Sequence, residues 1–228
     1  MKLAIAMATY QRKDGQTPFF LKRAIDSVFI QEHTDWQLFV VGDHYENAAE
    51  FCAITASYPP DRLRCLNLEK AMEREKYHYN KELLWNNGGV TAINIVADKA
   101  LAEGFSYICH LDHDDQWKPN HLKVISEAIE AVRADWLCTK TMHSTGVLPL
   151  VDSPSRLVPF LPCPGGVINS ATCYNYRSIP LRYRDSGTVP TDYDLWKRMS
   201  VYMKENNLAG YLINELTCIY EKGGYERN

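Results

Sequence analysis

The sequence predicts an α/β fold with a mainly parallel central sheet flanked by helices, and a small region of β structure and loops at the C-terminal end. Strand-like apolar runs alternate with amphipathic segments through the first half of the chain, which is typical of βαβ units. Such alternation favours a sheet that helices cover on both faces. Polar side chains follow three of these runs. Because ligands of such sheets bind beyond the carboxyl ends of the strands, we expect these side chains to share one crevice.

The first half of the chain supplies four strands and three helices. Apolar runs predict strands over residues 2–8, 36–43, 62–68 and 105–112. Apolar stripes of helical period predict helices over residues 19–31, 48–58 and 90–104. Pro59 and Pro60 stop the second helix, and Gly104 ends the third. Residues 69–89 are charged and helix-prone, so we expect an excursion from the sheet there.

The second half begins with a predicted helix over residues 119–134 and a strand over 136–144. Residues 149–166 are then rich in Pro and Gly, which makes them a candidate loop over a binding site. The remaining predicted elements are a strand-like stretch over 167–176, a helix from about 191 to 206 and a short terminal β segment. We expect residues 1–228 to form a single domain.

Composition narrows the class of protein. The chain has 228 residues, 46% of them hydrophobic, which is enough for a substantial core. Its 25 Lys and Arg against 28 Asp and Glu give a net charge of −3. No long run of basic residues is present to follow a nucleic-acid backbone, so we do not expect nucleic acid as the main partner. The seven cysteines form no CxxC pair, which argues against a zinc ribbon or disulfide framework and favours a reducing, cytoplasmic setting. The apolar N-terminus is too short for a signal sequence or membrane span, and we interpret it as the first strand.

An acidic cluster, HLDHDDQW, follows the fourth predicted strand at residues 110–117. In an extended chain Asp112 and Asp114 would point the same way, with Cα atoms roughly 6.5 Å apart. Carboxylate oxygens suit Mg²⁺ or Mn²⁺, which take one or two protein carboxylates and complete their shell with phosphate and water. The alternative is a solvated acidic turn before the predicted helix that begins at Pro119. His110 and His113 are expected to pack rather than bind metal, and Trp117 to pack under the site.

A second acidic pair stands at the start of the last helix, in TVPTDYDLWKRM. Thr191 and Asp194 have the spacing of a capping box, with Thr191 as the N-cap and Asp194 at the third helical position. Asp192 is not needed for that cap and is a candidate general base that accepts a proton from a substrate hydroxyl. The alternative is a first-turn carboxylate that only complements the helix dipole.

Six segments, taken in order, resemble the inverting family-2 glycosyltransferases of the GT-A fold. They are AIAMATYQR, LKRAIDSVFIQ, QLFVVGDHYEN, NNGGVTAIN, HLDHDDQWKPNHL and TDYDLWKRM. The resemblance covers most of the chain and weakens after about residue 207. It implies a GT-A (Rossmann-like) fold with a nucleotide-sugar-binding half over about residues 1–118 and an acceptor-binding half over about 119–228.

The resemblance also implies a role for particular residues. The expected nucleotide-sugar-binding residues are Thr9, Tyr10, Arg12, Asp43, Gly88, Gly89 and Asp112. Asp112 and Asp114 would hold a divalent cation, Mn²⁺ or Mg²⁺, and Asp192 would be the catalytic base. The implied donor is a UDP-sugar, and the implied acceptor is a hydroxyl of a glycan or a lipid-linked saccharide. Without a transmembrane segment, such an acceptor would be met from the cytoplasm, which leaves peripheral membrane contact open.

The chain departs from the family pattern at three places. Gly42-Asp43 stands where the family often has two adjacent acids, and His44-Tyr45 replaces small residues. The C-terminal IYEKGGYE offers Tyr220, Glu221 and Lys222 but no histidine to complete the metal site. Two alternatives stay open. A nucleotidyltransferase would want a glycine-rich loop after the first strand, and a binding module would keep the fold without turnover.

Overall fold

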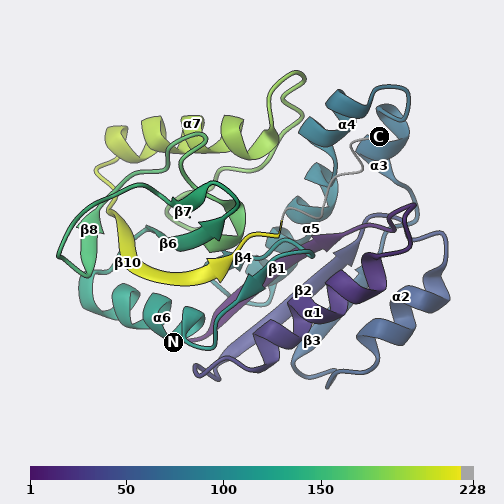
Figure 1. The fold of residues 1–228 in the computed structure, drawn as a ribbon, viewed down its shortest axis with the longest axis horizontal. Coiled ribbons are helices and arrows are strands. Elements are labelled where there is room, and N and C mark those ends of the chain that lie inside the picture. Colours follow the sequence, from purple (N-terminus) through teal and green to yellow (C-terminus); the bar gives the residue numbers. More distant parts are fainter. Residues whose placement is uncertain (222–228) are drawn as a thin grey trace.

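One sheet runs through the whole of the described chain, residues 1–221 of the computed structural model (Figure 1). Its strands are β1 (Leu3–Thr9), β2 (Trp36–Gly42), β3 (Leu63–Asn67), β4 (Tyr107–His110), β5 (Gln116–Trp117), β6 (Trp136–His143), β7 (Gly146–Leu148), β8 (Leu157–Pro159), β9 (Thr172–Asn175) and β10 (Gly210–Ile219). The order across the sheet is β3-β2-β1-β4-β9-β6-β10-β5, with β7 beside β6 and β8 beside β10.

The longer strands share one direction, which confirms the predicted mainly parallel sheet. β3, β2, β1 and β4 pair in parallel, and so do β6 and β10. The four-residue β9 lies antiparallel between β4 and β6, so the two parallel groups point the same way. The short strands β5, β7 and β8 run against their neighbours. The carboxyl ends of β1, β2 and β4 therefore meet at one edge.

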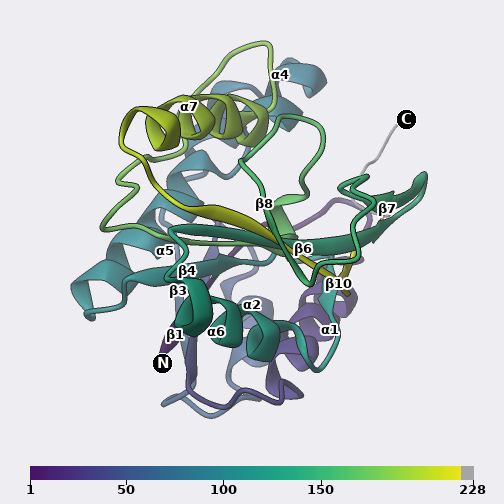
Figure 2. The same ribbon diagram turned by 90° about the vertical axis from the view of Figure 1, so that its left-hand side faces the viewer.

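Helices cover both faces of this sheet (Figures 1 and 2). They are α1 (Thr17–Phe29), α2 (Ala48–Thr55), α3 (Met72–Lys76), α4 (Lys81–Asn87), α5 (Val90–Ala102), α6 (His121–Val132) and α7 (Thr191–Glu205). The apolar stripes of α1 and α6 pack with Leu3, Ile5 and Met7 of β1. Alternate residues of the same strand, Ala4 and Ala6, pack with α5 and α7 on the other face. Burial on both faces explains why β1 is apolar up to its last residue, Thr9.

The predicted helices and strands are all present, most of them within a few residues of the expected bounds. Two expectations are corrected: the terminal β segment is the ten-residue strand β10 and not a short one, and the stretch expected over residues 167–176 is a strand only in β9, after a 3₁₀ turn over Asn169–Ala171. The excursion at residues 69–89 forms α3 and α4, as expected for a charged, helix-prone segment. The pattern missed β5, β7 and β8, which have only two or three residues each. All three carry too few residues for a local period. β5 and β8 are defined by hydrogen bonds to the distant β10, and β7 by a tight hairpin with the end of β6.

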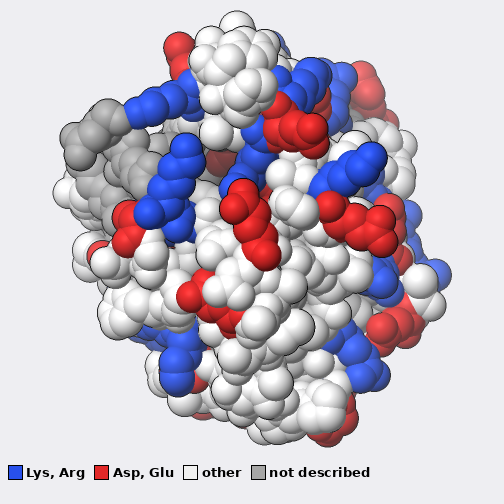
Figure 3. Space-filling model, turned by 90° about the vertical axis from the view of Figure 1, so that its right-hand side faces the viewer, with Lys and Arg blue, Asp and Glu red and all other residues white. Residues whose placement is uncertain are grey.

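Two surface properties bear on partners. Among residues 1–221, no helix has the length and apolar character needed to span a bilayer. On the face shown in Figure 3, basic and acidic side chains are interspersed rather than separated into a single-sign stripe. That mixture agrees with the small net charge of −3.

Candidate functional site

The polar residues predicted after the first, second and fourth strands lie at the same edge of the sheet. Parallel pairing sets Thr9 beside Gly42, and the amide of Asp43 donates to the carbonyl of Thr9 at 2.7 Å. On the other side of β1, the amide of Leu111 donates to the carbonyl of Ala6 at 3.0 Å and carries the chain into the acidic cluster. The three strand ends thus form the floor of one candidate site.

Asp43, Tyr10 and Arg74 form one end of this site. Asp43 is 2% exposed, and neither of its carboxylate oxygens has a hydrogen-bond partner among the described residues. Burial raises the pKa of Asp43 to about 6, against a smaller lowering by the Arg74 charge. The Arg74 guanidinium lies 4.9 Å from the centre of the Tyr10 ring and donates to the Asp43 carbonyl at 3.2 Å. These three residues, which we call the slot, bring together an aromatic ring, a cation and a buried acceptor.

Arg74 was not among the residues predicted from the sequence. It lies in α3, inside the charged excursion, where several acidic and basic residues follow one another and local pattern gives no orientation. The fold brings it over the strand ends because α3 contacts α5. In particular, Glu73 accepts hydrogen bonds from the amide and hydroxyl of Thr91 in the first turn of α5.

Thr9 is buried, and its hydroxyl is engaged within the protein. The Thr9 Oγ1 and the Tyr45 hydroxyl lie 2.6 Å apart, and the Tyr45 ring packs on Phe51 with centroids 4.8 Å apart. Tyr45, which departs from the small residue usual in the family, therefore fills space beneath the site. The geometry favours a supporting role for the Thr9 side chain rather than direct contact with a ligand.

Gly88 and Gly89 lie between α4 and α5. Gly89 has φ of +82° and forms the N-cap of α5, a conformation that favours glycine. A Cβ atom on Gly88 would approach the Leu84 carbonyl oxygen to 2.8 Å. Both glycines thus have a structural reason for their identity, and their contact with a nucleoside stays a prediction.

The acidic cluster lies in a turn rather than in an extended strand. The amide of Asp115 donates to the carbonyl of Asp112 at 3.1 Å, so the expected strand-like presentation of Asp112 and Asp114 is wrong. Their charges nevertheless interact. Burial first, and then the charges of Asp114 and Asp192, raise the pKa of Asp112 to about 7. The structure therefore brings Asp192 near Asp112, although about eighty residues separate them in the sequence.

Asp112 is held in place by polar contacts. Its Oδ1 accepts from Asn169 Nδ2 at 2.9 Å, and its amide donates to Ser170 Oγ at 3.0 Å. Asp114 is more open, with its side chain 17% exposed and 4.0 Å from Arg12 Nη1. Arg12 also forms a close ion pair with Asp14. Arg12 thus lies between the carboxylates of Asp14 and Asp114, beside the acidic cluster, and its contact with a nucleotide stays a prediction.

Asp115 is a third acid that sequence reasoning did not assign. It is 0% exposed, accepts from Ser170 Oγ at 2.5 Å and accepts from the amide of Glu221 at 2.9 Å. Burial raises the pKa of Asp115 well above its usual value, and the charges of Asp112 and Asp114 add to this. Asp115 joins the turn to the end of β10 and, through Ser170, supports Asp112. Its position directly after Asp114 in the acidic cluster is the sequence feature that could have identified it as part of the site.

The donor atoms in the turn fit a hard divalent cation in kind. Asp112 and Asp114 offer carboxylate oxygens whose mutual repulsion a cation would relieve. Within residues 1–221, no three His, Cys, Asp or Glu side chains lie close enough together to hold a metal ion. Mg²⁺ and Mn²⁺ can be bound by one or two protein carboxylates with phosphate and water as the other ligands. The set therefore suits an ion that is shared with a phosphorylated ligand.

Tyr220 faces the same acids from the end of the described chain. Its ring stacks on His143 with centroids 4.8 Å apart. Burial first, and then the charges of the four acids around it, raise the pKa of the Tyr220 hydroxyl to about 12. Lys222, which follows Glu221 in the sequence, lies outside the described residues.

The predicted capping box at the start of α7 is wrong. The helix begins at Thr191 itself, Pro190 is the N-cap, and no side chain caps the first turn. The Asp194 carboxylate instead accepts hydrogen bonds from Arg184 and from Arg198, at 2.7 to 3.0 Å. Two guanidinium groups bind a carboxylate more strongly than a backbone amide does, which explains the difference.

Unlike Asp194, Asp192 is not paired with a basic side chain among the described residues. Among the described residues its carboxylate forms no ion pair, and Oδ1 accepts only from the neighbouring Tyr193 amide at 2.7 Å. Burial raises its pKa. A carboxylate that is partly buried, that no cationic side chain neutralises and that lies near a second acidic group has the properties expected of a proton acceptor.

The aromatic predictions next to the cluster agree with the structure. His110 is 0% exposed, stacks on Tyr174 and lies 3.1 Å from the Tyr176 hydroxyl through Nε2. His113 is buried edge-on against Tyr10, with centroids 5.2 Å apart. Trp117 is 2% exposed and donates to the carbonyl of Ser170 at 2.6 Å. All three side chains pack under or beside the site.

Known proteins resemble this chain in sequence. A family model described as Glycosyl transferase family 2 matches residues 78–185, which include the acidic cluster. A protein described as an uncharacterized glycosyltransferase of Acanthamoeba polyphaga mimivirus is 29% identical over 243 residues. That alignment covers 100% of this chain and 97% of the viral protein.

Solved structures resemble it in fold. S. aureus TarS 1-349 in complex with UDP-GlcNAc has a TM-score of 0.69 at 12% identity, over 99% of this chain and 60% of that one. The mannosyltransferase PcManGT from Pyrobaculum calidifontis, in complex with GDP-Man and Mn²⁺, has a TM-score of 0.61 at 13% identity, over 98% and 58%. This chain thus spans about 60% of the length of the TarS structure. These matches confirm the predicted GT-A architecture.

Proposed function

The chain belongs to glycosyltransferase family 2, and from that premise we propose that it is a metal-dependent, inverting enzyme that transfers a sugar from a UDP-sugar. The acceptor is a hydroxyl of a glycan or lipid-linked saccharide. One observation carries the proposal. Asp192 is partly buried, has no cationic partner among residues 1–221, and lies close enough to Asp112, which would support a nucleotide diphosphate, for its charge to raise the pKa of that carboxyl.

The uridine assignment is supported by the slot of Tyr10, Arg74 and Asp43. The buried Asp43 oxygens, which lack partners within residues 1–221, suit the ring N–H of uracil, and Tyr10 would border the base. Arg74 would lie over the same ring and favour the ionised form of Asp43, because its charge lowers the pKa of that carboxyl. The complexes of TarS with UDP and with UDP-GlcNAc add support for a uridine donor.

Asp112 and Asp114 would hold the cation, and the complex of PcManGT with Mn²⁺ supports a divalent ion in a protein of this fold. When bound, such an ion supplies positive charge where the leaving diphosphate becomes more negative. The chain's own part is to present the two carboxylates. Asn169 and Ser170 form hydrogen bonds that orient Asp112, and Ser170 is itself held by the hydrogen bond that it donates to Asp115.

Asp192 would accept the proton of the acceptor hydroxyl as that oxygen attacks the anomeric carbon. Its raised pKa makes it a better proton acceptor than an exposed aspartate, because basicity rises with pKa. Attack from the face opposite the leaving diphosphate inverts the configuration of the sugar. The acceptor would lie on the side of α7, in the half of the chain from about residue 119 onward.

A cytoplasmic location remains part of the proposal. Its support is that all seven cysteines are free thiols. Such a state is ordinary for a protein in a reducing compartment.

A nucleotide screen with Mn²⁺ tests the donor assignment. UDP and UDP-GlcNAc should raise the melting temperature more than GDP, GDP-mannose or CMP do. A nucleotide at about 100 times its dissociation constant would stabilise the fold by roughly 2.7 kcal/mol. Hydrolysis of each UDP-sugar should then be measured for wild type and Asp192→Asn. Equal stabilisation by every nucleotide would reject uridine. Equal turnover by both proteins would reject Asp192 as the base, and the absence of turnover in both would indicate a binding module.

A further inference from the structure

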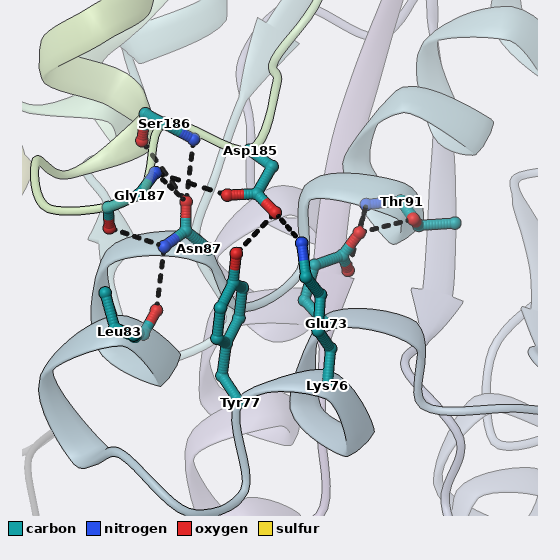
Figure 4. Close-up of polar contacts among 9 residues, drawn as sticks. All are labelled: Glu73, Lys76, Tyr77, Leu83, Asn87, Thr91, Asp185, Ser186 and Gly187. Atoms are coloured by element: carbon teal, nitrogen blue, oxygen red, sulfur yellow. Dashed lines mark hydrogen bonds and ion pairs between the residues drawn. The ribbon is translucent and has the colours of Figure 1, made fainter.

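Asn87, at the end of α4, is a fully buried side chain with no role in the proposed chemistry. It is 0% exposed, and both ends of its carboxamide are engaged (Figure 4). Nδ2 donates to the carbonyl of Leu83 in its own helix at 2.9 Å and to that of Gly187 at 2.8 Å. Oδ1 accepts from the amides of Ser186 at 2.8 Å and Gly187 at 3.2 Å. One asparagine thus binds two consecutive residues that are about 100 positions away.

Ser186 and Gly187 belong to an irregular segment, residues 183–189, that we call the strap. The strap runs beside α4 and ends just before α7, where Asp192 lies (Figures 1 and 4). Ser186 Oγ donates to the carbonyl of Val189 at 2.6 Å, and this hydrogen bond holds the end of the strap. Pro190 and Thr191 follow directly.

Other contacts hold the strap on the same side. Asp185 accepts from Lys76 Nζ and from the Tyr77 hydroxyl, both in or next to α3. Asn94 of α5 pairs with the backbone of Tyr183, through both its amide at 3.1 Å and its carbonyl at 2.8 Å. The strap is therefore joined along its length to the excursion and to α5.

The strap is also tied to the first turn of α7. Arg184 donates to the Asp194 carboxylate at 2.8 and 3.0 Å, and Asp194 lies two residues beyond Asp192 in the same turn. The excursion that carries Arg74 to the nucleotide slot thus contacts, through Asn87 and Asp185, the segment that leads into Asp192. Asn87 is the only member of these contacts that binds backbone on both sides with a neutral, fully buried group.

We propose that Asn87 is a positioning residue for Asp192: it fixes the strap against α4 and thereby sets where the first turn of α7 places that carboxylate. The inference rests on the proposed role of Asp192 as the base. A misplacement of about 1 Å can cost on the order of 100-fold in rate even when the change is remote from the reacting atoms. Asn87 touches neither donor nor acceptor in this proposal.

The first measurement does not depend on activity. Asn87→Ala should speed hydrogen exchange of the backbone amides in residues 186–195 by about tenfold or more, and leave exchange in β1 and β4 unchanged. The matched control is Asn214→Ala, because Asn214 also holds a loop through its carboxamide, at the Ser153 carbonyl, but on another part of the molecule. Wild-type exchange at residues 186–195 in Asn87→Ala would overturn the proposal.

The second measurement uses the UDP-sugar that wild type hydrolyses fastest. Asn87→Ala should lower kcat by about 10- to 100-fold while the dissociation constant for UDP changes less than about twofold. In the Asp192→Asn background, the same change should have almost no further effect, since the carboxylate it positions is gone. Full additivity of the two losses would overturn the proposal.

A milder variant covers the case in which Asn87→Ala does not fold. Tyr77→Phe keeps the buried ring and removes only the hydroxyl that Asp185 accepts from. It should give smaller changes of the same kind, with the same loss of effect in Asp192→Asn. If Asp192→Asn turns over as wild type does, the proposed function fails. If only the Asn87 and Tyr77 variants behave as wild type, the proposed function stands and the positioning role fails.

Discussion

Asp192 and Asp194 lie two residues apart on the first turn of α7, yet their carboxylates have opposite surroundings. Arg184 and Arg198 both donate to Asp194. Burial alone would raise the pKa of Asp194, but these hydrogen bonds outweigh it and lower the pKa. Asp192 has no such partner among residues 1–221, and burial raises its pKa. The same turn thus carries one carboxylate that is stabilised as an anion and one that is not.

Substitution of each aspartate by asparagine should separate structure from turnover. Asp192→Asn should leave the melting temperature unchanged or slightly higher and lower the transfer or hydrolysis rate by about 10² to 10⁴-fold, the usual span for loss of a general base. UDP affinity should stay near that of wild type. Asp194→Asn should cost roughly 1 kcal/mol of stability, since its arginine partners are partly exposed, and retain most activity. An inactive Asp194→Asn protein beside an active Asp192→Asn protein would reverse this assignment.

Asp114 should matter for metal-dependent binding and not for folding. Its side chain is partly exposed and its charge raises the pKa of the neighbouring Asp112, so Asp114→Ala removes a like charge and should not lower the melting temperature. Calorimetric titration should show that Mn²⁺ no longer strengthens UDP binding in this variant, and that Asp112→Ala has a weaker effect of the same kind. Mn²⁺-dependent UDP affinity equal to that of wild type would exclude the site.

The fold was predictable because its main elements carry local signals. Two-sided burial makes β1 apolar up to Ala8, and Pro59 and Gly104 follow within a few residues of real helix ends. The short strands beside β10 carry no such signal. The Thr191 capping box failed for a related reason: the spacing was right, but Arg184, ten residues earlier in an irregular segment, competes for Asp194. A local motif cannot register a distant partner.

The candidate site was predictable where acids cluster in sequence and not where the fold assembles it. Asp112, Asp114 and Asp192 stand in recognisable segments, and the structure brings their charges together. Arg74 and Asn87 come from the excursion, and their contacts with Asp43 and with the strap span 31 and about 100 positions. Nothing in the charged segment around Arg74 distinguishes it from its neighbours. Only the way α3 and α4 fold back over the strand ends does so.

The burial of Asp43 predicts a pH-dependent gain from its replacement. The folded-state pKa of Asp43, about 6, lies above the usual 3.8, so this carboxyl ionises less readily in the folded protein than in the unfolded chain. The free energy of unfolding therefore falls as the pH rises from about 4 to about 6. Asp43→Asn should therefore stabilise the protein by roughly 2 kcal/mol more at pH 8 than at pH 4. Chemical denaturation at the two pH values measures this. The control is Asp194→Asn, whose lowered pKa predicts the opposite sign: it should destabilise more at pH 8. Equal effects of Asp43→Asn at both pH values would contradict the prediction.

The last prediction concerns Arg74, which the slot geometry adds to the nucleotide-binding residues. Arg74→Ala removes the cation over the Tyr10 ring and the hydrogen bond to the Asp43 carbonyl, and should weaken UDP binding by about tenfold, or roughly 1.4 kcal/mol. Because the Arg74 charge lowers the pKa of Asp43, its removal raises that pKa further, so less of the carboxylate is ionised near pH 6. The loss of UDP affinity should therefore be larger at pH 6 than at pH 8.

Arg64→Ala is the matched control for this variant. Arg64 lies on β3, is half-exposed, and donates to the carbonyl of Pro60 at 2.6 Å, so it offers the same kind of arginine-to-carbonyl contact away from the slot. Titration calorimetry with UDP at both pH values should show wild-type affinity for Arg64→Ala. Comparable losses in the two arginine variants would mean that general charge, and not the position of Arg74 over Tyr10, governs binding. A loss in Arg74→Ala that is equal at pH 6 and pH 8 would separate Arg74 from the ionisation of Asp43.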